Sequence, residues 1–151
     1  MKKLTILLTI LLVSCATFKE QLDKQANQQL TNTKSELSHR FYLVGDAGNA
    51  SLNESTLPLL SLQKRLQGAP ENSSVIFLGD NVYQHGIPKK DSEGYKLAKH
   101  RLQTQIESVQ EYKGQTIFIP GNHDYHSNGI KGLKRQEKLV ENALGLSLIH
   151  I

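Results

Sequence analysis

The chain has 151 residues, enough for one ordinary domain, with 38% hydrophobic and 21% charged residues. This composition is typical of a globular protein and argues against a disordered chain. The net charge is +4, from 18 basic and 14 acidic residues, and it falls to +2 (16 against 14) without Lys2 and Lys3. So small an excess is too weak to argue for a nucleic-acid surface, and no nucleic-acid partner is expected. Cys15 is the single cysteine, which excludes an internal disulfide.

Residues 1–14 have the pattern of an export signal. Two lysines follow the initiating methionine, the apolar run "LTILLTILLV" comes next, and small residues follow it. The run is about half of the ~20 apolar residues that a membrane-spanning helix needs. A cleaved signal peptide is therefore predicted.

The stretch "LVSC", ending at Cys15, resembles a bacterial lipobox. The resemblance implies that Cys15 is lipidated and anchors the protein in a membrane of the bacterial cell envelope. The alternative is an ordinary signal peptide with an incidental cysteine. Residues 15–38 are rich in Gln, Asn, Lys, Ser and Thr without an apolar face, so they are predicted to be a flexible tether.

From residue 39 the chain alternates between short apolar runs and amphipathic segments. The runs "RFYLV", "SVIFL" and "TIFIP" are rich in aromatic and β-branched residues and predict buried strands. The intervals at 51–67, 93–112 and 131–144 carry apolar residues at helical spacing. The resulting order, β-α-β-α-β-α, predicts a layered α/β fold with parallel strands.

Polar residues follow each predicted strand, in "GDAGN", "GDNVY" and "GNHDY". Because the carboxyl ends of parallel strands meet at one edge of a sheet, Asp46, Asp80 and Asn122 are expected to converge there. One Gly-Asp pair is weak evidence, since both residues are common in turns. Three polar strand ends favour a site that binds hard metal ions through oxygen and nitrogen atoms. Two such ions suit phosphoryl transfer to water.

These three blocks resemble the first signature motifs of the calcineurin-like metallophosphoesterases. Many members begin with Asp-x-His, but Gly48 occupies the histidine position here. The combination GD-x-G and GD-x-x-Y is instead similar to the purple acid phosphatases. The resemblance covers residues 39–145 and implies the amino-terminal half of a four-layer αββα sandwich, which is incomplete in this chain.

The resemblance also assigns roles. Asp46 would bind the first metal, Asp80 would bridge two metals, Tyr83 would bind the first as phenolate, and Asn122 would bind the second. His123 would contact the phosphate or protonate the leaving group. The implied cofactors are two divalent or trivalent ions, iron together with zinc, manganese or a second iron.

Each assignment has an ordinary structural alternative. The two aspartates could serve turns or helix caps, Tyr83 could only pack its ring, and Asn122 could be a turn residue. Asp124 is expected to orient its neighbours, and His85 and His126 to be loop residues rather than ligands. Four glycines are expected to let the backbone turn beside the ions: Gly45, Gly48, Gly79 and Gly121.

The family's two later histidine blocks do not occur, and His150 is the only histidine after His126. Residues 146–151, "LSLIHI", are the translation of CTG-TCT-CTT-ATA-CAC-ATC, a mosaic-end sequencing adapter. We therefore expect these residues to be translated adapter and the natural protein to continue beyond residue 145. The alternative is a genuine short apolar strand.

The predicted function is hydrolysis of phosphate esters by a metal-activated water, with this fragment inactive by itself. The alternative is a non-catalytic envelope binding or assembly module on the same fold.

Overall fold

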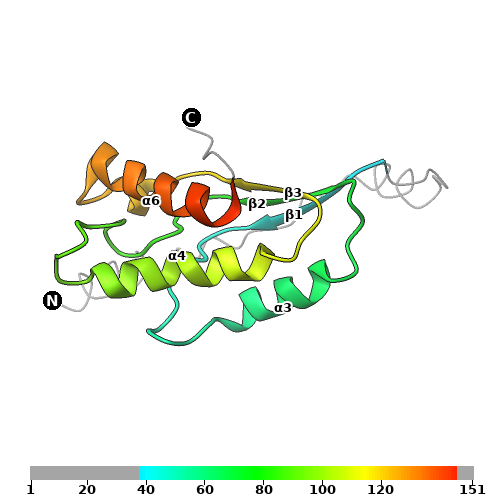
Figure 1. Ribbon diagram of the computed structural model, residues 1–151, viewed down its shortest axis with the longest axis horizontal. Helices are drawn as coiled ribbons and strands as arrows, with labels where there is room; N and C mark the ends of the chain where they lie inside the picture. The colour runs from blue at the N-terminus through cyan, green and yellow to red at the C-terminus, as the bar shows by residue number, and fades with distance from the viewer. Residues whose placement is uncertain (1–37, 146–151) are drawn as a thin grey trace, which may run out of the picture. The chain divides into compact units, whose positions relative to one another are not determined.

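A computed structural model describes residues 38–145 (Figure 1). The predicted signal peptide, the predicted lipidation site Cys15, nearly all of the predicted tether and the predicted adapter lie outside these residues. The described part alternates strands and helices in the following order: β1 (Arg40–Val44), α3 (Leu57–Leu66), β2 (Ser73–Phe77), α4 (Tyr95–Val109), β3 (Gln115–Phe118), α5 (Asn122–Tyr125) and α6 (Gly129–Leu144). The predicted α/β class and the β-α-β-α-β-α order are confirmed.

The three strands form a parallel sheet in the order β1-β2-β3. Val44 pairs with Phe77, and Phe77 pairs with Phe118, so all three strands end at the same level. The loops that follow them therefore leave the sheet side by side. This register brings the three polar sequence blocks to one edge.

The three long helices pack against one face of the sheet. With consecutive strands added in one direction, right-handed crossovers place every helix on the same side. The core joins apolar residues of α3, α4 and α6 to Val75, Phe77 and Phe118, whose two aromatic rings stack at 4.3 Å. In Figure 1 the helices α3, α4 and α6 lie next to one another in that order.

The opposite face of the sheet is open. Phe41 and Leu43 of β1 are 61% and 62% exposed, and Leu43 lies in register with Ile76 and, beyond it, Ile117. The prediction that all three strands are buried is therefore wrong for β1, whose outer face lacks a covering layer within residues 38–145. Parallel sheets are normally covered on both faces, so this apolar surface is unusual.

The helices differ from prediction mainly at their ends. The helix expected at 51–67 begins only at Leu57, because Pro58 fits the first turn of a helix but not its interior. Its Leu60 is 48% exposed, whereas the predicted apolar face of α4 is buried throughout. The short helix α5 within "GNHDY" was not predicted. No helix in residues 38–145 has the length and apolar character to cross a bilayer.

Candidate metal centre

Two of the expected ligands follow neighbouring strands in similar backbone conformations. Asp46 lies in the turn after β1, called here the Asp46 turn (residues 45–48), and Asp80 lies in the turn after β2, the Asp80 turn (residues 79–83). Both aspartates are in the left-handed region, with φ angles of 54° and 52°. Residues with a Cβ seldom adopt this conformation, although aspartate tolerates it better than most. Its recurrence at two adjacent turns is typical of a functional site.

Tyr83 brings the two carboxylates together. Its phenolic oxygen lies 2.5 Å from Oδ1 of Asp46 and 3.0 Å from Oδ2 of Asp80. Hydrogen bonding to Asp46, followed by burial and the interaction with Asp80, raises the pKa of the Tyr83 phenol. The phenol therefore keeps its proton beside two negative groups. A cation among these oxygen atoms would reverse that preference.

His123 contacts the same cluster through its backbone and its ring. Its N–H donates to Oδ1 of Asp80 at 3.1 Å, and its ring lies 4.5 Å from that of Tyr83. Nδ1 is 2.9 Å from the carbonyl oxygen of Gln84. Because a carbonyl can only accept, this contact assigns the proton to Nδ1 and leaves the lone pair of a neutral ring on Nε2.

The side chain of Asn122, another expected ligand, does not join the cluster of Asp46, Asp80 and Tyr83. It begins α5 and is exposed, and its side chain makes no hydrogen bond within residues 38–145. Its neighbours Gly121 and His123 both approach Asp80. The backbone around Asn122 is therefore at the site, but the side-chain amide oxygen of Asn122 makes no contact with the carboxylates of Asp46 and Asp80.

Asp124 is a buried carboxylate that binds backbone N–H groups of the Asp80 turn and of the block after β3. It is fully buried, and its carboxylate accepts hydrogen bonds from the backbone N–H groups of Gly121, Asn81 and Val82 at 2.8–3.1 Å. Burial raises the pKa of the Asp124 carboxyl, although these hydrogen bonds act in the opposite direction. This geometry agrees with the expected orienting role and joins the block after β3 to the Asp80 turn.

Glycine is required at specific close contacts. A Cβ on Gly48 would lie 2.3 Å from the backbone carbon of Asn81, and one on Gly121 would lie 2.3 Å from Oδ1 of Asp80. Gly79 has a φ angle of 112°. The expectation was wrong for Gly45, which has neither a positive φ nor any heavy atom near the position of a Cβ.

Helix residues that the sequence analysis did not identify tie the Asp80 turn to Ala50, in the segment just after the Asp46 turn. Arg101 of α4 donates from Nε to the carbonyl oxygen of Ala50 at 3.0 Å and from a terminal nitrogen to that of Tyr83 at 2.6 Å. The buried Gln105, one helical turn later, donates to the carbonyl oxygen of Asn81 at 2.7 Å. Both residues adjoin the apolar stripe of α4, and polar residues there give no signal in a single sequence.

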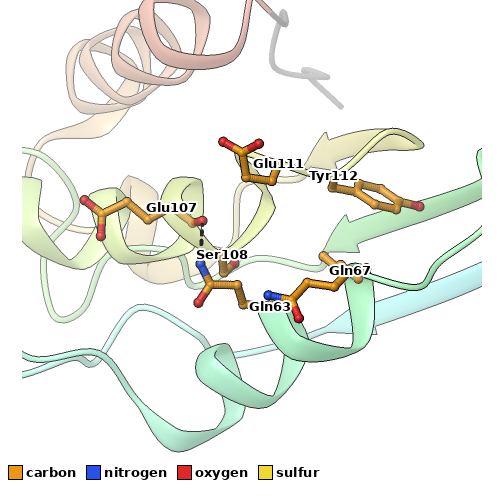
Figure 2. A pocket seen from close by; sticks show the side chains of 7 residues that line it. Gln63, Gln67, Glu107, Ser108, Glu111 and Tyr112 are labelled. Atoms are coloured by element: carbon orange, nitrogen blue, oxygen red, sulfur yellow. Dashed lines mark hydrogen bonds between the residues drawn. The ribbon is translucent and has the colours of Figure 1, made fainter.

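A separate small cavity lies at the opposite edge of the sheet (Figure 2). It is between the last turns of α3 and α4, where Gln63 donates to the carbonyl oxygen of Glu107. Tyr112, also on its wall, contacts Ser73 at the start of β2. None of the expected site residues lines this cavity, so it is distinct from the carboxyl-edge site.

Within residues 38–145, no group of three or more His, Cys, Asp or Glu side chains is placed to hold a metal ion. The groups that converge are instead two carboxylates and a phenol. Oxygen donors of this kind fit hard cations, and they amount to part of a coordination shell.

Comparison with known proteins gives the family. Residues 39–147, well over half of the chain, match the family model for calcineurin-like phosphoesterases. The chain therefore belongs to the calcineurin-like phosphoesterase family, whose members generally bind two divalent metal ions and act on phosphate esters. The searches of curated proteins and of solved structures found no significant match.

Proposed function

We propose that this chain is the amino-terminal part of a metal-dependent hydrolase of phosphate esters, of the purple acid phosphatase-like variant. The observation that carries the proposal is the convergence of Asp46 and Asp80 on Tyr83, whose phenolic oxygen lies 2.5 Å from Oδ1 of Asp46 and 3.0 Å from Oδ2 of Asp80. Two ions held there would supply an activated water and neutralise charge on the phosphate.

The assignment of Tyr83 is supported by the close contacts of Gly48. In many family members a histidine occupies this position, but here even a Cβ would overlap the backbone of Asn81. The hydrogen bonds between Gly48 and the Asp80 turn keep the two backbones together. Tyr83 lies in that same turn and offers an oxygen where the histidine is missing.

The proposed roles are those that the family resemblance implies. Asp46 and Tyr83 would hold the first ion, Asp80 would serve both ions, and Asn122 would offer its amide oxygen to the second. Iron is the ion that a phenolate ligand suits, with zinc, manganese or iron beside it.

His123 is proposed to contact the substrate. Its backbone is fixed on Asp80 and its Nδ1 on the carbonyl oxygen of Gln84, so the ring is oriented before substrate arrives. Nε2 is the atom that remains to bind a phosphate oxygen or to pass a proton to the leaving alcohol, provided that it is protonated.

The open face of the sheet supports a longer natural protein. Phe41 and Leu43 are exposed where a family member would have its second sheet, and the later histidine blocks do not occur in the sequence. We propose that coding sequence continues beyond residue 145 and that residues 146–151 are translated adapter. An independent nucleotide record that reads through LSLIHI with other codons would contradict this.

We also propose that the protein is a lipoprotein of the bacterial envelope, attached through Cys15. This rests on the sequence of residues 1–15. Cys15→Ser should release the protein from membranes, as judged by fractionation.

The test of function uses the full-length protein, expressed with iron and zinc and assayed with a phosphomonoester and a phosphodiester. Hydrolysis is expected, lowered by about 100- to 1000-fold in Asp80→Asn and by a smaller factor in Asp46→Asn. A visible tyrosinate-to-iron band that Tyr83→Phe removes is expected with it. Absence of both metal uptake and hydrolysis would refute the enzyme and favour the non-catalytic binding module. Hydrolysis without the visible band would contradict only the assignment of iron as the bound ion and of Tyr83 as its ligand.

A further inference from the structure

Three fully buried amide side chains have polar atoms without a hydrogen-bond partner. They are Asn81 in the Asp80 turn, Gln105 of α4 and Gln136 of α6. Within residues 38–145, the buried side-chain nitrogen and oxygen atoms that lack a partner all belong to these three residues. Buried polar groups in folded proteins are nearly always hydrogen-bonded, either directly or through ordered water. The three amides therefore indicate a further partner in the interior.

The orientation of the Asn81 amide is fixed by the bonds of its nitrogen. Nδ2 donates to the carbonyl oxygen of Ile119 at 2.8 Å and to Oδ2 of Asp124 at 3.2 Å. Exchanging the nitrogen and the oxygen would place the oxygen against these two acceptors. Oδ1 of Asn81 is therefore an acceptor for which the described part of the chain supplies no donor.

The Gln105 amide is fixed in the same manner. Its Nε2 donates to the carbonyl oxygen of Asn81 at 2.7 Å and to that of Arg101 at 2.9 Å. Its Oε1 is therefore a second acceptor that needs a donor. Because Nε2 of Gln105 contacts the backbone of Asn81, the two unpaired oxygen atoms belong to neighbouring residues. A single donor of two hydrogen bonds is the simplest group that serves both.

Gln136 lies on the buried face of α6, and this helix contacts α4. Val140, one turn further along the same face, shares the apolar core with Leu102, three residues before Gln105 on α4. Gln136 and Gln105 therefore border the same core from two neighbouring helices. Both polar atoms of the Gln136 amide lack a partner, so its Nε2 adds a donor to the two acceptors.

We propose that a buried water molecule bridges Asn81, Gln105 and Gln136. Its two hydrogens satisfy Oδ1 of Asn81 and Oε1 of Gln105, and its oxygen accepts from Nε2 of Gln136. Three hydrogen bonds are typical of a buried water. A monovalent cation also suits two oxygen atoms, but the N–H groups of Gln136 would repel it. The water joins α4 and α6 to the turn that carries Asp80, whether or not the protein hydrolyses esters.

The direct test is a high-resolution crystal structure of the full-length protein. The expected result is a water about 2.7–3.1 Å from Oδ1 of Asn81, Oε1 of Gln105 and Nε2 of Gln136. Direct hydrogen bonds among the three amides, with no density between them, would overturn the inference. An anomalous peak at this position after a rubidium soak would assign a cation in place of the water and would overturn it as well.

A second test measures thermal unfolding of Gln136→Met in the full-length protein. Methionine has a similar volume but cannot donate, so the water would lose a partner and Tm should fall by about 4–10 °C. The matched control is Gln110→Met at the exposed end of α4, which should shift Tm by less than about 2 °C. An unchanged or raised Tm for Gln136→Met would contradict the water, because replacing an unbonded buried amide by an apolar group is favourable. Neither measurement requires hydrolysis, so failure of the proposed function would leave both results intact.

Discussion

The Asp46 turn and the Asp80 turn have the same left-handed aspartate but different support. The Asp80 turn receives hydrogen bonds from its neighbours on several sides, from Gln105 to the Asn81 carbonyl and from the backbone of His123 to Asp80 itself. Asp46 is exposed, and its carboxylate contacts Tyr83 of the other turn. The difference indicates that the Asp80 turn is the more rigid of the two and that the position of the Asp46 carboxylate depends on its contact with Tyr83 of the Asp80 turn.

The largest expected effect is on Asp80. In the full-length protein, Asp80→Asn should lower kcat/KM for a phosphomonoester by about 100- to 1000-fold, because it removes the charge that both proposed ions share. Asp46→Asn should cost less, since it affects one ion. The control is Asp91→Asn in an exposed loop, which should change the rate by less than about 2-fold. Equal losses of kcat/KM in Asp80→Asn and Asp46→Asn would contradict the proposal that the two turns differ in their importance for the site.

The contact between the turns is tested at Gly48. Gly48→Ala should lower the free energy of unfolding by about 2–3 kcal/mol, because its Cβ would overlap the rigid backbone at Asn81. Gly68→Ala is the control, since no heavy atom lies within 4 Å of its Cβ position and its φ is not positive. It should be neutral or stabilising by up to about 1 kcal/mol. Similar denaturation midpoints for the two variants would contradict the close packing.

The anchoring of the Asp80 turn is tested at Asp124. Asp124→Asn replaces one acceptor oxygen by an amide that faces backbone N–H donors, and should cost about 2 kcal/mol of unfolding free energy. Glu111→Gln, on an exposed residue of the other edge, should stay within about 0.5 kcal/mol in the same denaturant titration. A neutral Asp124→Asn would show that this carboxylate does not hold the turn.

The smallest expected effect concerns the link that Arg101 of α4 makes between the Asp80 turn and Ala50, just after the Asp46 turn. Arg101→Lys should weaken metal binding by about 10-fold, because a single ammonium does not reproduce the two directed bonds to the carbonyls of Ala50 and Tyr83. Arg65→Lys, on the exposed side of α3, should leave the metal dissociation constant unchanged. If Arg101→Lys binds metal as tightly as wild type, the guanidinium is not needed to position the turns.

Local patterns in the sequence were sufficient to predict much of the fold. The run 40–44 matches β1, and the apolar spacing of α4 identified the face that is buried. Both follow from hydrophobic periodicity, which is a property of the chain itself. The exposure of β1 could not be read from that pattern, because it depends on whether another layer covers the sheet.

The candidate site, like the fold, has features that the sequence pattern predicts and others that depend on tertiary packing. The pattern of glycines and aspartates at strand ends predicted that Asp46 and Asp80 lie close together, and the geometry through Tyr83 agrees. The supporting roles of Arg101 and Gln105 depend on where α4 crosses the two turns, so their identities alone carry no signal. The contact between His85 and His126, 41 positions apart, is likewise a consequence of the fold.

The central claim is that Asp46, Asp80 and Tyr83 bind metal together. The most direct measurement is anomalous diffraction from crystals of the full-length protein grown with iron and zinc. The account predicts ions about 2.0–2.2 Å from oxygen atoms of all three side chains, with Asp80 shared between the two ions. Ions bound elsewhere, or no ion at these residues at saturating metal, would contradict it.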